Sequence, residues 1–176
     1  MQNLSQKIRI AGIVPESVVD GKGIRFTIFV QGCHFCCKGC HNPDAQNFDG
    51  GYDISLQEIL EQINKNPLLD GITLSGGEPF IHAESLAILS KAVKAENLNI
   101  WCYTGYTLEE LQEKAKTDFN IKALLSEIDV LVDGLFVEEL KDLTLPFRGS
   151  KNQRIIELKK GDFSQCNYVN RKKLKL

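Results

Sequence analysis

The sequence has no hydrophobic run long enough to cross a membrane and no excess of basic residues. A membrane-spanning helix needs about 20 consecutive apolar residues, and no stretch of the 176 residues approaches that length. The formal net charge is −2, which gives no indication of nucleic-acid binding. The N-terminal segment also lacks the apolar core of a secretory signal peptide. We therefore expect a cytoplasmic protein that binds neither nucleic acid nor a membrane.

The sequence also lacks internal repeats, low-complexity stretches and linkers rich in Pro, Gly or Ser. Its length suits a single domain. We predict one domain over residues 1–176, with a core at about 8–158 and a polar C-terminal tail at 159–176 that has no regular structure. The basic residues at the end of that tail indicate a solvated surface; they are Arg171, Lys172, Lys173 and Lys175.

Strand and helix signals alternate along the rest of the chain. β-Branched and aromatic residues predict strands at 24–30, 71–75, 99–103, 128–132 and 153–158. Two capping-box patterns predict helix starts, at Ser55–Glu58 and Thr107–Glu110, and apolar spacing predicts a further helix through Leu86, Leu89 and Val93. Alternating strands and helices indicate βαβ units. Five or six strands are too few for a complete eight-stranded barrel, so we predict an α/β fold: a partial TIM-like barrel of mainly parallel strands with outer helices.

Unusual residues follow four of the predicted strands. Cysteines follow the first strand, and Gly76-Gly77-Glu78-Pro79 follows the second. Thr104-Gly105-Tyr106 follows the third and Asp133-Gly134 the fourth. Because function gathers at the carboxyl ends of parallel strands, these four segments indicate one shared site.

The cysteines carry the most specific signal. Four of the six lie at positions 33, 36, 37 and 40, and in a reducing compartment such crowding indicates a metal or cluster site. Cysteine thiolates bind iron–sulfur clusters, with four ligands in the usual [4Fe–4S] case. Three ligands spaced as Cys33-x3-Cys37-x2-Cys40 leave one iron open, as a catalytic metal site requires.

Zinc is the competing interpretation. Cys36 or Cys37 with Cys40, together with His34 or His41, offers a tetrahedral ligand set. A structural zinc site normally takes two ligand pairs from separated turns, and here all candidates lie in one loop. Spacing therefore favours a cluster over a zinc-stabilised binding module, and it leaves Cys36 open as the middle ligand.

The spacing Cys33-x3-Cys37-x2-Cys40 resembles the signature of the radical S-adenosylmethionine (SAM) superfamily, in which Cys37 takes the middle position. Residues 19–25, 40–43 and 76–79 resemble the activating enzymes of glycyl radical proteins. The stretches 101–106, 132–137 and 147–154 are similar to those of the activating proteins of anaerobic ribonucleoside-triphosphate reductases. The resemblance covers roughly residues 8–158.

This resemblance implies a [4Fe–4S] cluster held by Cys33, Cys37 and Cys40, whose open iron chelates SAM. It implies an electron from a flavodoxin-type donor and reductive cleavage of SAM to methionine and a 5′-deoxyadenosyl radical. That radical would take a hydrogen atom from a glycine of the large subunit of the anaerobic ribonucleotide reductase. An alternative partner is another glycyl radical enzyme, of the pyruvate formate-lyase type.

The resemblance also implies where SAM is bound. The implied cofactor contacts are Gly39, Cys40, His41, Gly76, Gly77, Glu78 and Asp133. Glycine lacks a Cβ, so the backbone at 76–77 can approach a ligand closely. Two alternatives stay open. Glu78 fixes its turn without contacting the cofactor, or Asp133 serves simply as the first residue of an Asp-Gly turn. Arg148 and Asn152 face either the cofactor's carboxylate, the partner or solvent.

Overall fold

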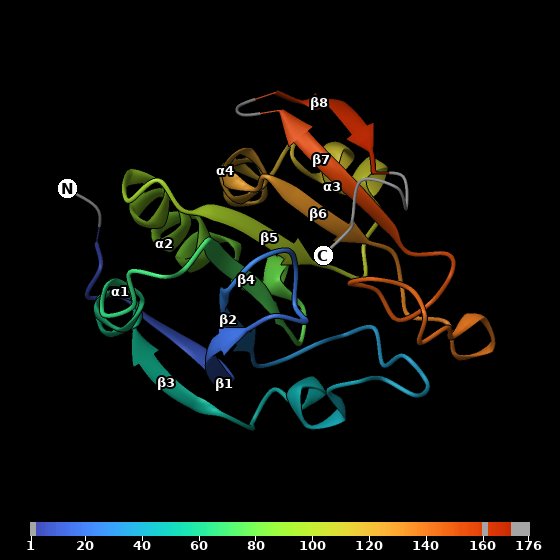
Figure 1. Ribbon diagram of the computed structural model, residues 1–176, viewed down its shortest axis with the longest axis horizontal. Helices are drawn as coiled ribbons and strands as arrows, with labels where there is room; N and C mark the ends of the chain where they lie inside the picture. The colour runs from blue at the N-terminus through green and yellow to red at the C-terminus, as the bar shows by residue number, and fades with distance from the viewer. Residues whose placement is uncertain (1–2, 160–161, 170–176) are drawn as a thin grey trace.

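A computed structural model describes residues 3–159 and 162–169. Its strands form one eight-stranded sheet in the order β3-β1-β2-β4-β5-β6-β7-β8 (Figure 1). The strands are β1 (Lys7–Ser17), β2 (Arg25–Val30), β3 (Tyr52–Ser55), β4 (Gly71–Gly76), β5 (Asn99–Tyr103), β6 (Val130–Asp133), β7 (Arg154–Lys159) and β8 (Asp162–Tyr168).

The centre of the sheet is parallel and its two margins are antiparallel. β2, β4, β5 and β6 pair in parallel, whereas β1 and β3 at one margin and β7 and β8 at the other pair antiparallel. Parallel neighbours need crossover connections, and helices supply them. The helices are α1 (Leu56–Asn64), α2 (Ala83–Ala95), α3 (Leu108–Lys114) and α4 (Phe119–Glu127), with short 3₁₀ turns η1 (Pro43–Gln46), η2 (Pro79–His82) and η3 (Glu138–Leu140). The predicted α/β class with mainly parallel central strands is confirmed.

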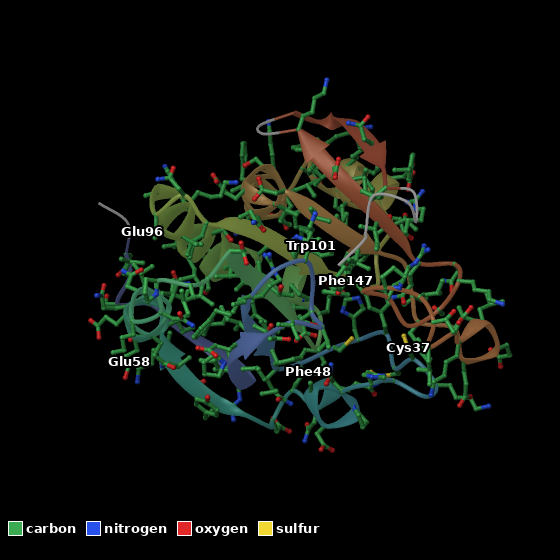
Figure 2. All side chains as sticks on the ribbon, viewed as in Figure 1. Cys37, Phe48, Glu58, Glu96, Trp101 and Phe147 are labelled. Atoms are coloured by element: carbon green, nitrogen blue, oxygen red, sulfur yellow. The ribbon has the colours of Figure 1, made fainter. Side chains whose placement is uncertain are left out.

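The two faces of the sheet are covered differently. Alternate strand residues such as Leu74 and Leu131 pack into the main core with the helices, which line one side of the sheet in Figure 1. The opposite face carries a smaller cluster around Trp101 and Val132. Phe147, from the loop after η3, packs edge-on against Trp101 with ring centroids 5.4 Å apart (Figure 2). Loops therefore cover this second face, where the site lies.

Both predicted capping boxes form. The Ser55 hydroxyl accepts from the Glu58 N–H at 3.2 Å, and the Glu58 carboxylate accepts from the Ser55 N–H at 3.0 Å. Thr107 and Glu110 repeat the arrangement at the start of α3. Such caps satisfy N–H groups that the first helical turn leaves free.

The C-terminal prediction is wrong in part. Residues 162–168 form β8, which pairs antiparallel with β7, so the segment beyond Lys159 is not without regular structure. Asn167 and Tyr168 are exposed, as an edge strand with one solvated face allows. Residues 160–161 and 170–176, including the basic end, lie outside the described residues. No helix within the described ranges is long and apolar enough to cross a membrane.

Candidate functional site

The carboxyl ends of the four parallel strands surround one cavity of about 730 Å³. In Figure 1 the loops after β2 and β6 lie on the same side of the molecule. All four predicted strand-end segments contribute to the cavity wall, including Thr104, Gly105 and Gly134. The predicted site residues that line it are Cys33, Cys37, Cys40, His41, Gly76, Gly77 and Glu78.

Two predicted contacts, Gly39 and Asp133, lie outside the cavity wall. Gly39 has φ +71° and faces Glu138, since an added Cβ would lie 3.0 Å from that carboxylate. Asp133 is fully buried. Its carboxylate accepts the Leu108 N–H at 2.8 Å, the Arg154 Nε–H at 2.9 Å and a further bond from Arg154 Nη2. Asp133 therefore anchors the start of α3 to β7.

The cysteine segment separates Cys36 from the other three cysteines. Cys33, Cys37 and Cys40 are half-buried, whereas Cys36 is exposed and lies outside the cavity wall. Cys36 also has φ +50°, a left-handed conformation that is uncommon for a residue with a side chain. Figure 2 shows Cys37 in the loop beyond β2. The arrangement favours Cys37 over Cys36 as the middle ligand.

The three thiols fit a cluster better than a single ion. Within the described ranges, no three His, Cys, Asp or Glu side chains lie close enough to share one metal ion. Each thiolate of a [4Fe–4S] cluster binds a different iron, so the thiols need to line one cavity rather than meet at a point. Burial raises the pKa of the Cys33 and Cys37 thiols, and both must release a proton when they bind iron.

The loop after β5 supports the cysteine segment from one side. The Tyr106 ring packs edge-on against Phe35 at a centroid distance of 4.9 Å. Its hydroxyl lies 3.1 Å from His34 Nε2. Gly105 permits this approach, because an added Cβ would lie 2.5 Å from the Phe35 ring.

The loop after β6 supports the same segment from the other side. The Phe136 backbone lies close enough to the Cys37 thiol to oppose the rise that burial causes in the pKa of that thiol. Lys38 Nζ lies 3.0 Å from the Glu138 carboxylate. That ion pair is exposed, so it contributes little to stability.

Glu78 is the buried acid of the site, with 1% of its surface exposed. Its carboxylate accepts from the Phe80 N–H at 3.0 Å, the Thr104 hydroxyl at 2.9 Å and the Gly105 N–H at 2.9 Å. Burial raises the pKa of Glu78 to about 7, although these hydrogen bonds oppose the shift. Glu78 thus ties the end of β4 to the loop after β5. It fixes its turn, which is the alternative left open by the sequence, and it also lines the cavity.

Close backbone packing explains the two glycines before Glu78. Gly76 has φ +98°, and a Cβ there would lie 2.4 Å from the Val30 nitrogen. A Cβ on Gly77 would lie 2.1 Å from the Gly32 carbonyl oxygen. The Gly77 N–H donates to Val30 O, and the Glu78 N–H to Gly32 O, both at 2.8 Å. The glycines therefore let the end of β4 lie against the residues that lead into Cys33.

The two polar residues left open by the sequence are placed differently. Arg148 lines the cavity, and its Nη1 donates to Gln153 O at 2.7 Å. Its Nε is buried with no hydrogen-bond partner among the described atoms. Asn152 is exposed and donates to Leu135 O at 2.7 Å, so it holds the loop after β6. Arg148 is thus the cation beside the cavity.

We expect Tyr106→Ala to weaken retention of iron, while Tyr106→Phe stays close to wild type. Alanine removes the ring that supports Phe35, a contact worth about 1 kcal/mol beyond its buried area. Phenylalanine keeps the ring and loses only the exposed contact of the hydroxyl with His34. The measurement is the rate at which visible absorbance decays in air after anaerobic reconstitution. Equal decay rates in both variants would show that the ring does not support the cysteine segment.

The chain is similar in sequence to known proteins. The family model of a 4Fe–4S single cluster domain matches residues 19–156. An anaerobic ribonucleoside-triphosphate reductase-activating protein of Haemophilus influenzae is 39% identical over 155 residues, which cover 82% of this chain and 95% of that protein. The protein of the same name from Vibrio cholerae is 42% identical over 80% of this chain and 92% of its own length. That of Escherichia coli is 36% identical over 82% and 96%.

The family-model match at 19–156 covers the cysteine segment and the strand ends around the cavity. The cluster domain favours iron–sulfur over the zinc alternative, in agreement with the thiols that line one cavity. At these identities and coverages, the chain belongs to the family of anaerobic ribonucleoside-triphosphate reductase-activating proteins, enzymes built on a 4Fe–4S domain.

Proposed function

We propose that the chain activates an anaerobic ribonucleotide reductase by generating a glycyl radical on its large subunit. The observation that carries the proposal is the lining of one cavity by Cys33, Cys37 and Cys40 at the ends of the parallel strands. When bound there, a [4Fe–4S] cluster and SAM supply one-electron chemistry: reductive cleavage of SAM to methionine and a 5′-deoxyadenosyl radical, which takes a hydrogen atom from the glycine. The protein supplies binding, orientation and exclusion of water.

We assign the cluster to the three thiolates and SAM to the backbone around them. The peptide groups of Gly39, Cys40 and His41 form one side of the SAM site, and those of Gly76 and Gly77 form the other. Four of these five residues line the cavity: Cys40, His41, Gly76 and Gly77. Backbone groups suit this role because each offers a fixed donor and acceptor.

We assign the charged residues two kinds of role. Arg148 is the cation of the cavity wall, and its unpartnered Nε suits a carboxylate such as that of SAM. Glu78 and Asp133 are positioning residues, because protein donors already occupy their carboxylates. This assignment replaces direct cofactor contact at Asp133 with support of the strand end.

We further propose the setting in which the protein works. The chain forms a single radical SAM domain whose sheet is part of an incomplete barrel, and it acts in the cytoplasm. A flavodoxin-type protein donates the electron. A reductase is favoured over a formate-lyase-type partner, since the three relatives described above carry a reductase-activating name.

The test is anaerobic reconstitution with iron and sulfide, followed by incubation with SAM and dithionite. We expect a brown protein whose broad visible absorption bleaches on reduction, together with release of 5′-deoxyadenosine. Absorbance, iron content and liquid chromatography provide the three readouts. A colourless protein that holds stoichiometric zinc and releases no nucleoside would refute the proposal.

A further inference from the structure

Strand β1 has an edge that the sheet leaves unpaired. β2 pairs with β1 from Ile10 to Ser17. On its other side, β3 pairs only with Lys7 to Ile10. Within residues 3–159 and 162–169, no strand pairs with this second edge over residues 11–14, and Pro15, which has no N–H, ends the stretch. An unpaired edge presents a row of free N–H and C=O groups to an incoming chain.

The chain itself turns away from this edge at Gly51. Gly51 has φ +70°, and an added Cβ would lie 2.2 Å from Ile10 O. Before Gly51 the chain passes through η1, and after it the chain enters β3, which pairs with β1 only at residues 7–10. A groove of about 310 Å³ separates residues 11–14 of β1 from the segment 41–45.

The residues that line this groove show that it runs along the backbone edge of β1. It is lined by four consecutive residues of β1, Ala11 to Val14. Successive side chains of a strand point to opposite faces, so one groove contacts four in a row only along the strand edge. A register shift between Ile10 and Gly12 bends the strand there, and such bulges redirect pairing.

The groove adjoins the cluster cavity. Phe29, His41 and Asn42 line both. At the end of β1 the chain continues into Val18 and Val19, which line the cavity and are 62% and 72% exposed. A path of weakly charged surface therefore runs from the free strand edge to the three thiols.

We propose that the unpaired edge of β1 seats an extended segment of the partner protein, which adds as a strand and carries the target glycine into the cavity. This inference rests on the proposed function, because a protein substrate must bring a backbone Cα beside the cluster. Strand addition suits that need, since main-chain hydrogen bonds bind a segment whatever its side chains are. Among the described residues, His41 and Asp44 are the only charged or titratable ones that line the groove, which suits an uncharged, glycine-containing segment.

The first test fills the groove with Gly12→Phe. Nothing lies within 4 Å of a Cβ at Gly12, and its φ is not left-handed, so the ring enters open space without backbone strain. We expect cluster content and uncoupled SAM cleavage to match wild type. The rate of glycyl radical formation on the reductase should fall by roughly tenfold or more, mainly through KM. The matched control is Ala95→Phe, at the exposed end of α2.

The second test needs no variant. Hydrogen–deuterium exchange of the reconstituted protein is measured with the reductase, and with a synthetic peptide of the reductase's glycine-containing loop. We expect the amides of residues 11–14 to exchange more slowly in both complexes. A peptide that is N-methylated at alternate residues should leave their exchange unchanged.

The outcomes separate this inference from the proposed function. Unchanged exchange at 11–14 in a formed complex, or wild-type KM in Gly12→Phe, would overturn strand addition while glycyl radical formation persists. Protection that depends only on the concentration of the activating protein would assign the edge to a second copy and also overturn it. Failure of the wild-type protein to cleave SAM would instead remove the proposed function itself.

Discussion

Alanine at Cys33, Cys37 or Cys40 is expected to abolish the cluster, whereas Cys36→Ala is expected to keep it. Each of the first three thiols lines the cavity, and Cys36 is exposed outside it. Changes to residues that merely support metal ligands cost 10–100-fold in affinity, so loss of a ligand should cost roughly 100-fold or more. Iron content and 5′-deoxyadenosine release after anaerobic reconstitution measure the effect.

Cys36→Ala is a matched control, because it removes one thiol from the same loop. Its left-handed backbone is no worse for alanine than for cysteine. A colourless, inactive Cys36→Ala protein beside an active Cys37→Ala protein would assign the cluster to Cys33-x2-Cys36-x3-Cys40. That result would contradict the placement of Cys37 in the cavity wall.

Glu78→Gln is expected to be less stable than wild type by about 2 kcal/mol at about pH 5, and this order should reverse by about pH 8. An amide NH₂ must replace one of the two oxygens that now accept from Phe80, Thr104 and Gly105. At about pH 5 the wild-type carboxyl is protonated, but its hydroxyl oxygen can still accept a hydrogen bond, whereas the amide nitrogen cannot, so the variant loses one of these bonds. Denaturant unfolding of both reconstituted proteins under anaerobic conditions gives the difference.

The pH dependence follows from the raised pKa of Glu78. Its folded-state pKa is about 7 against an ordinary value of 4.5. Between these values the folded state holds a proton that the unfolded state has released, so stability falls as the pH rises. From about pH 5 to about pH 8 the wild type should lose about 3 kcal/mol relative to Glu78→Gln, which cannot titrate. A constant difference over that range would show that burial does not govern this carboxyl group.

The parallel centre of the fold could be predicted because each of its parts has a local signal. β-Branched residues marked β2 and β4, and the capping boxes at Ser55 and Thr107 marked the helix starts that the structure shows. The location of the site could be predicted as well, because parallel strands bring their carboxyl ends to one edge of the sheet. Seven of the nine predicted site residues line the cavity.

The marginal strands β1, β3 and β8 were missed, whereas the predicted strand at 153–158 forms as β7. In β1 the alternation of Ile8 and Ile10 with polar residues was a readable signal, and both side chains are buried. Asp118 before Ile121 was likewise a readable cap for α4, where its carboxylate accepts two backbone N–H groups. β8 had weaker signals, because its polar residues pair with β7 through the backbone.

Other features of the site depend on contacts between distant segments. No local pattern indicates that Phe35 meets Tyr106, since these residues come from the loops after β2 and β5. Nor does an Asp-Gly pair indicate that the Asp133 carboxylate accepts a hydrogen bond from Arg154, 21 residues later. The groove beside β1 arises from the turn at Gly51, which depends on its approach to Ile10.

The central claim is tested most directly by electron paramagnetic resonance on a mixture of the reduced, reconstituted protein, SAM and the large reductase subunit. The account predicts an organic radical that requires all three components and resides on the reductase. Its hyperfine splitting should collapse when the reductase carries glycine deuterated at the α-carbon. Cleavage of SAM with no radical on the reductase, together with a glycyl radical on a formate-lyase-type enzyme under the same conditions, would contradict it.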